Sequence, residues 1–136
     1  MMYPFADYVD ILGTQYKIEL KTRDEDPGLR HGDMTHGYCS YTEKRIVIND
    51  RSKQSNFSED EEYSYLRYAM KTLRHEIVHA FLAESGLAGN AKMSGSWATN
   101  EEMVDWIALQ GPKITKAWLD AGALFSLDIY SERGNE

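Results

Sequence analysis

Apolar and polar residues alternate along the first half of the chain in the way that β-strands require. Three segments show this pattern or a matching enrichment in tyrosine, isoleucine and valine: Gln15–Lys21, Gly37–Tyr41 and Arg45–Asn49. In the first segment Tyr16, Ile18 and Leu20 fall on one face, which predicts a half-buried strand. The polar segment 22–33 predicts a loop, and residues 42–44 predict a turn between the second and third strands.

A long helix is predicted from Ser58 onwards. Ser58 and Glu61 have the spacing of a capping box, and the acidic residues around them suit the positive end of a helix. Apolar residues then recur every three or four positions, at Leu66, Met70, Leu73, Ile77 and Ala80. Further apolar residues widen this surface, at Val78, Phe81 and Leu82. We therefore expect the C-terminal half of the helix to be buried nearly all round, with Gly86 marking its end.

Two more helices are expected after this one. A glutamate-bearing helix is predicted from near Thr99 to Gly111, and a short C-terminal helix from Pro112 to Ala121, because proline favours the first position of a helix. Gly122 follows as a stop signal. Strands followed by helices favour an α+β fold, in which a small antiparallel or mixed sheet packs on the long helix. The 136 residues suit a single domain, 1–136.

Charge and cysteine content narrow the possible partners and location. The net charge is −7, with 22 acidic and 15 basic residues, so we expect binding neither to nucleic acid nor to an anionic membrane. No signal-peptide pattern or long apolar run is present, and we expect a cytoplasmic monomer. Cys39 is the single cysteine, so no disulfide forms within the chain, and we interpret it as a small buried core residue.

One motif on the long helix carries chemistry. His75, Glu76 and His79 form the pattern H-E-x-x-H. On a helix, residues four apart share a face and lie about 6 Å apart along the axis, a separation from which two imidazoles can reach one zinc ion. Glu76 sits at the edge of the same face, where it can take a proton from a water molecule on the metal. The motif therefore predicts a zinc site with Glu76 as the catalytic base.

A catalytic zinc site usually has three protein ligands and one water. No histidine follows His79, so the third ligand is expected to be a carboxylate, Glu101 or Glu102. Thr99 and Glu102 fit a second capping box, which would occupy Glu102 at the helix end and favour Glu101 as the ligand. Asp105 lies one turn beyond Glu101 and can accept the distal N–H of a zinc-bound histidine.

These residues resemble a known family. His75, Glu76 and His79, followed by Asn100, Glu101 and Asp105, are similar to the gluzincin pattern H-E-x-x-H…N-E-x-x-x-D of thermolysin-like peptidases. The small size and the strand pair resemble compact phage or prophage metallopeptidases, of the broad kind that includes the ImmA/IrrE-type proteins. The resemblance covers about Gly37 to Gln110 and implies a zincin-like fold. It also implies that Arg45–Asn49 is an edge strand that aligns an extended peptide substrate.

The chain departs from thermolysin-like enzymes in one respect. Those enzymes carry a later histidine that stabilises the tetrahedral oxyanion, and no histidine follows His79 here. The candidates for this role are upstream histidines and three tyrosines: His31, His36, Tyr38, Tyr41 and Tyr130.

The function expected from the sequence is zinc-dependent hydrolysis of peptide bonds in a peptide or protein substrate. Two other functions stay open. One is a noncatalytic zinc-containing binding or regulatory module of phage or prophage type. The other is a hydrolase that acts on a nonpeptide amide, since it would share the same site.

Overall fold

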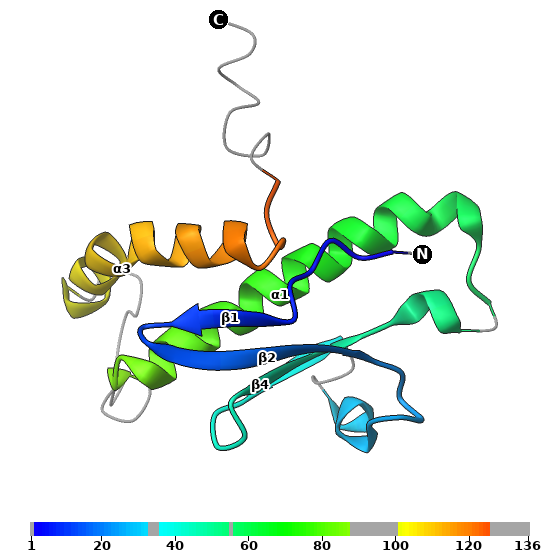
Figure 1. The fold of residues 1–136 in the computed structure, drawn as a ribbon, viewed down its shortest axis with the longest axis horizontal. Helices are drawn as coiled ribbons and strands as arrows, with labels where there is room; N and C mark the ends of the chain where they lie inside the picture. Colours follow the sequence, from blue (N-terminus) through cyan, green and yellow to red (C-terminus); the bar gives the residue numbers. More distant parts are fainter. Residues whose placement is uncertain (1, 33–35, 55, 88–100, 126–136) are drawn as a thin grey trace, which may run out of the picture.

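The computed structural model of the chain describes residues 2–32, 36–54, 56–87 and 101–125, and within the last range four side chains lie outside the description: Glu101, Val104, Asp105 and Ala108. Figure 1 shows a small sheet with two helices on one side of it. The α+β class predicted from the order of the elements is therefore confirmed.

The sheet has four strands: β1 (Tyr8–Ile11), β2 (Thr14–Lys21), β3 (Gly37–Ser40) and β4 (Arg45–Asn49). Their order is β1-β2-β4-β3. β1 pairs with β2 and β3 pairs with β4 in antiparallel fashion, whereas the central pair β2–β4 is parallel. The three predicted strands are confirmed to within one residue at each end. The expectation that Arg45–Asn49 is an edge strand is wrong, because β3 closes the sheet on that side.

β1 was not predicted from the sequence. It is only four residues long, so its alternation of exposed and buried residues is too short to stand out in the sequence. The strand joins β2 through Leu12 and Gly13, whose φ angles are 52° and 92°. Positive φ at both positions matches a type I′ turn, whose twist suits a tight hairpin. A leucine at the first position lacks the usual Asn-Gly or Asp-Gly signal of such turns.

Helix α1 (Glu62–Glu84) is the long helix that the sequence predicts. Ser58 accepts a hydrogen bond from the N–H of Asp60 and begins a short 3-10 turn (Glu59–Glu61) that leads into α1. Glu61 is hydrogen-bonded to Tyr65, one turn ahead, so its side chain points along the helix. The sequence therefore located the start of the helix correctly to within a few residues.

Helix α3 (Glu101–Asp120) corrects the prediction of two separate helices. It continues without a break through Gly111 and Pro112. A proline inside a helix costs a backbone hydrogen bond and introduces steric clashes, and two features reduce this cost here. Gly111 has no Cβ to clash with the proline ring, and the following turns bury Ile114 and Ala117 against the rest of the protein. Packing of this apolar face therefore overrides the local stop signal. Thr99, the predicted cap, lies outside the described residues.

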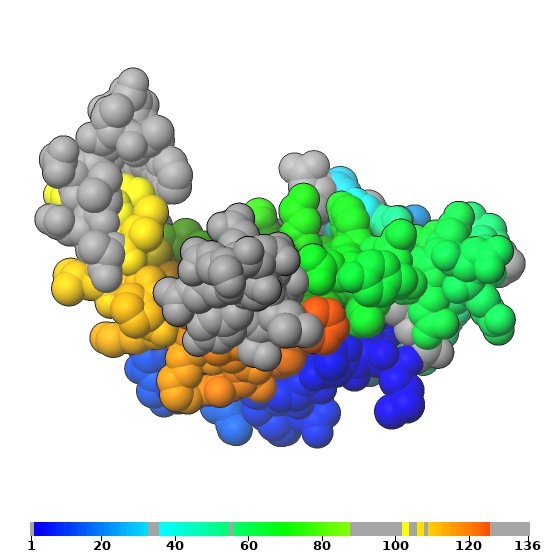
Figure 2. All heavy atoms as spheres, turned by 90° about the horizontal axis from the view of Figure 1, so that it is seen from above, coloured from blue at the N-terminus to red at the C-terminus, as the bar shows by residue number. Residues whose placement is uncertain are grey.

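The core lies between the sheet and the two helices. Figure 2, seen from above, shows α3 along one side of α1, with the N-terminal strand emerging beneath α3. α1 packs on β3 and β4, and α3 packs on β1. The fully buried residues with the largest side chains come from the strands and α1, with Leu29 added from the 3-10 turn after β2: Tyr16, Phe81, Ile11, Leu29, Ile46, Ile48, Met70, Leu73, Ile77 and Val47. No helix among the described residues has the length and apolar character that crossing a bilayer would require.

The end of α3 is fixed by the N-terminal segment. The N–H groups of Gly122 and Ala123 donate to the carbonyls of Leu119 and Trp118, which is the Schellman pattern of a helix C-terminus. Gly122 has a φ of 75°, as this pattern requires. Ala6 donates from its N–H to the carbonyl of Ala121 at 2.9 Å, so the chain before β1 lies directly against this cap.

Candidate metal centre

The H-E-x-x-H motif lies in the last three turns of α1, on the boundary between two helix faces. The face toward the sheet carries buried residues such as Leu73, Ile77 and Ala80. The flank of the helix beside the edge strand β3 carries His75, which is exposed, and His79, which is partly buried. Glu76 falls between the two faces at 100° per residue, which explains why it is buried while its neighbour His75 is exposed.

The two imidazoles lie close enough to share one ion. The Nε2 atoms of His75 and His79 are 3.1 Å apart, and the two ring centroids are 4.7 Å apart. Two nitrogens bound tetrahedrally to zinc at about 2.0–2.1 Å would be separated by about 3.3 Å. Glu76 Oε1 lies 3.9 Å from His75 Nε2, and ligand atoms of all three residues lie within 4.8 Å of one another. The donor set and its spacing fit zinc.

Burial sets the charge state of this cluster. Glu76 is only 6% exposed, and burial raises the pKa of its carboxyl to about 7. Burial and the charge of His75 lower the pKa of His79, which favours the neutral imidazole that metal binding needs. A buried carboxylate is costly to desolvate unless a cation or hydrogen-bond donors lie nearby. The surroundings of Glu76 therefore suit a site in which a positive charge is held.

The expectation that this half of the helix is buried nearly all round is wrong. The side chain of His75 is 67% exposed, and Lys71, one turn earlier, is exposed as well. The reason is the layered fold, in which α1 rests on the sheet through one face only. The exposed face leaves the cluster of His75, Glu76 and His79 accessible from outside.

A groove runs past the cluster between α1 and the edge strand β3. It consists of two adjoining hollows of about 490 and 250 Å³, and both are lined by Gly37, His75, Glu76 and His79. The larger hollow extends toward His36, Tyr68, Lys71 and Thr72, and the smaller one toward Tyr38, Cys39 and Tyr41. The groove is therefore bounded on one side by a strand that pairs with the sheet along only one edge.

The remaining predicted site residues fall into three groups. Glu101 and Asp105 belong to α3, but their side chains lie outside the described residues, as does Tyr130. Glu102, the alternative ligand, is exposed at the start of α3. Of the two upstream histidines, His36 lines the larger hollow, while His31 is exposed and follows a short 3-10 turn, η1 (Pro27–Arg30).

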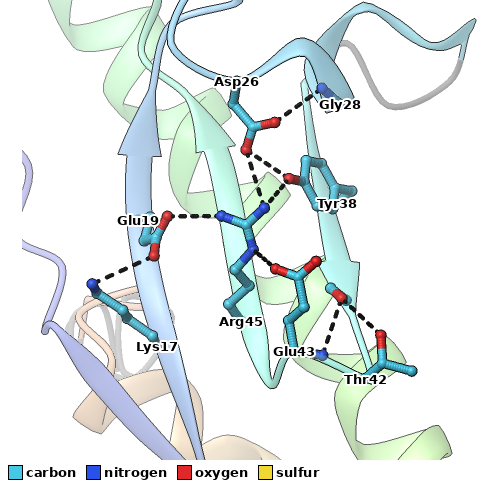
Figure 3. A network of polar contacts seen from close by, with 9 residues as sticks. Lys17, Glu19, Asp26, Gly28, Tyr38, Thr42, Glu43 and Arg45 are labelled. Carbon is cyan, nitrogen blue, oxygen red and sulfur yellow. Dashed lines mark hydrogen bonds and ion pairs between the residues drawn. The ribbon is translucent and has the colours of Figure 1, made fainter.

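Tyr38 lines the smaller hollow, but its hydroxyl is engaged on the far face of the sheet. Figure 3 shows this network, which centres on Arg45. The Tyr38 hydroxyl donates to Asp26 at 2.6 Å and accepts from Arg45 at 2.9 Å. Arg45 also pairs with Glu19 at 3.1 Å and Glu43 at 2.6 Å. The network ties β3, one wall of the groove, to its neighbours. It also engages the Tyr38 hydroxyl, so this group is not free to donate to an oxyanion in the groove.

Cys39 and Tyr41 complete the smaller hollow. Cys39 is partly buried and packs against the core, in agreement with its interpretation as a core residue. Burial, with the charge of Glu76 adding to it, raises the pKa of its thiol to about 12, so the thiol stays protonated near neutral pH. Tyr41 is exposed at the mouth of the hollow. Of the candidate oxyanion donors in the described residues, His36 and Tyr41 therefore lie in the groove with free access to it.

Three groove residues escaped the sequence analysis: Tyr68, Lys71 and Thr72. A signal for them was present, since residues seven, four and three positions before His75 share its face of a helix. Polar residues along an otherwise apolar helix mark the face that is turned away from the core.

Three comparisons with known proteins add no relative to this description. The chain matches no protein-family model, no curated protein sequence and no solved structure.

Proposed function

We propose that the chain is a zinc-dependent metallopeptidase of compact gluzincin type that cleaves peptides or proteins. One observation carries the proposal: two imidazole nitrogens 3.1 Å apart lie beside a buried carboxylate in the wall of an open groove. A purely structural site would be expected to be closed by four protein ligands. An exposed His75 beside a groove favours a catalytic arrangement.

In this proposal His75 and His79 bind the zinc ion through Nε2, and Glu101 supplies the third protein ligand. Asp105, one turn after Glu101, holds the orientation of a ligand histidine by accepting its other N–H. Zinc bound there would polarise the substrate carbonyl and make water a better nucleophile. Glu76 accepts a proton from the attacking water and passes it to the leaving amine. Its burial holds the carboxylate in place next to the ligands.

The edge strand β3 gives the groove a means of holding a substrate. Its outer backbone N–H and C=O groups face away from β4. An extended peptide that pairs with them would lie along the groove and pass the cluster. This role belongs to Gly37–Ser40 and replaces the one that the family resemblance implied for Arg45–Asn49.

Metal content tests the proposal. Purified without added metal, the wild-type chain is expected to contain about one zinc per chain, and His79→Ala almost none, because only two of the three proposed protein ligands would remain. Mass spectrometry of the metal gives the answer directly. His31→Ala is the matched control, because this histidine is exposed and does not line the groove. Wild-type protein that stays free of zinc even after zinc is added would refute the proposal.

The third ligand can be identified by comparing two neighbouring glutamates. Glu101→Gln is expected to weaken zinc binding by at least about tenfold, since losing a ligand costs more than losing an outer hydrogen-bond partner. Glu102→Gln should bind zinc like the wild type. Competition with a coloured chelator measures both affinities. Weakened binding in Glu102→Gln alone would assign the ligand to Glu102.

A further inference from the structure

The two ends of the groove differ in charge. The end of the larger hollow is lined by Lys71 and His36, together with Tyr68 and Thr72. Arg51 lies directly behind His36, in contact with its Nδ1 atom, and 5.5 Å above the Tyr68 ring. The smaller hollow at the other end is lined by Tyr38, Cys39 and Tyr41, which carry no charge near neutral pH.

The contact between Arg51 and His36 fixes the hydrogen-bonding character of the histidine. A guanidinium can only donate, so Nδ1 of His36 accepts and the ring proton resides on Nε2. Burial, followed by the charges of Arg51 and Arg23, lowers the pKa of His36 and keeps the ring neutral. His36 thus offers an N–H donor in the same hollow that Lys71 lines, with Arg51 in contact with its other ring nitrogen.

This basic end is unusual in a chain with 22 acidic and 15 basic residues. Among the described residues that line the two hollows, Glu76 is the single carboxylate. The lysines and arginines in the ion pairs of the described part of the chain are Lys17, Arg30, Lys44, Arg45 and Lys116. None of these pairs involves Lys71, which lines the groove and is exposed, so its charge is accessible to a ligand there. Arg51 lines neither hollow and adds positive charge from behind His36.

The direction of β3 relates the basic end to a substrate. The strand runs from Gly37, beside His36 and Tyr68, to Ser40, beside Tyr41. A peptide that adds to the sheet in antiparallel fashion runs the other way. Its C-terminal part then lies at the basic end, and its N-terminal part lies at the tyrosine end.

We propose that the basic end of the groove, with Lys71 as the contacting cation, binds a carboxylate on the C-terminal side of the cleaved bond. The inference rests on the proposed peptidase function and adds a substrate class to it. The carboxylate comes either from a Glu or Asp side chain or from the C-terminus of the peptide. Both present the same group to an ammonium and an imidazole N–H.

The first test uses the zinc-loaded full chain and a mixed peptide library whose cleavage products are sequenced by mass spectrometry. Cleaved bonds are expected to be followed within three residues by Glu, Asp or a free C-terminus. Matched peptides that differ by Glu against Gln at that position, or by a free against an amidated end, separate the two sources. The charged peptide of each pair should have a kcat/KM about three- to tenfold higher, because one exposed charge-assisted hydrogen bond gives a preference of about this size.

Charge reversal on the protein completes the test. Lys71→Glu should abolish or invert the preference. Lys113→Glu, which makes the same change of net charge at an exposed position on α3 in a separate hollow, should retain it. Equal cleavage of charged and neutral peptides by the wild type, or equal losses in both variants, would overturn the proposal.

A binding measurement separates this inference from the proposed function. If the zinc-loaded chain cleaves none of the peptides, the peptidase proposal fails on its own. Fluorescence anisotropy with labelled alanine-rich peptides that end in Glu, in Gln or in Gln amide then decides the charge preference. Tighter binding of the charged peptides by wild type and Lys113→Glu, but not by Lys71→Glu, supports the basic end as a carboxylate site. Equal binding of all three peptides refutes it.

Discussion

Replacing Glu76 by glutamine is expected to leave zinc bound and to reduce kcat/KM for peptide hydrolysis by at least about 100-fold. Removal of a general base costs about 10²- to 10⁴-fold, and glutamine keeps the shape of the side chain but cannot accept the proton. Because Glu76 is buried, an isosteric replacement leaves the packing of α1 on the sheet intact. The rate is measured with a cleavable peptide, and the metal content is measured on the same preparation.

The matched control for this variant is Glu62→Gln, which makes the same chemical change at an exposed position in the first turn of α1. It should retain both zinc and activity. A Glu76→Gln protein that cleaves peptides at the wild-type rate would remove Glu76 from the mechanism. A chain that binds zinc but shows no hydrolysis in either form would favour the noncatalytic zinc module.

Gly122→Ala is expected to destabilise the fold by about 3 kcal/mol or more. A Cβ at this position would lie 1.9 Å from the carbonyl oxygen of Pro4, which is far inside van der Waals contact. The φ of 75° adds the cost of a left-handed conformation, about 1 kcal/mol. To relieve the clash, the N-terminal segment must leave the end of α3, and the hydrogen bond from Ala6 to Ala121 is lost. Urea denaturation followed by circular dichroism gives the free energy of unfolding.

Gly13→Ala separates steric clash from backbone strain. Gly13 also has a positive φ, 92°, but a Cβ there would meet no atom within 4 Å. Gly13→Ala should therefore lower the free energy of unfolding by only about 1 kcal/mol, which is the cost of backbone strain alone. If both variants lose the same stability, the close packing of Pro4 against Gly122 does not contribute to the free energy of unfolding.

Much of the fold follows from local sequence patterns. The alternation at Tyr16, Ile18 and Leu20 located β2, and the three- to four-residue period from Leu66 to Ala80 located α1, because each pattern reflects a single buried face. β1 escaped because four residues carry little periodicity and its turn lacks the usual asparagine or aspartate. The division of α3 at Pro112 was wrong because propensity is local, whereas burial of Ile114 and Ala117 depends on the whole fold.

The candidate site shows the same division between local and distant information. One helix turn fixes the distance between His75 and His79, so the motif alone was enough to bring them together. Neither the edge position of β3 nor the basic end around Lys71 was foreseen, because both depend on how β3, β4 and α1 pack together. The choice of Glu101 over Glu102 rests on capping rules rather than on packing, and it stays a prediction.

The parallel pairing of β2 with β4 has a consequence for the order of folding. β1–β2 and β3–β4 are hairpins with loops of only two and four residues, so their ends lie close together along the chain. The seam between them joins residues 28 positions apart, such as Ile18 with Ile46. Closing a loop of this length costs conformational entropy before the native contacts of the seam can offset it. We expect this seam to close late in folding. α1 contacts both hairpins, β3 and β4 in one and β1 in the other, so its position beside the groove is final only once the two hairpins have joined.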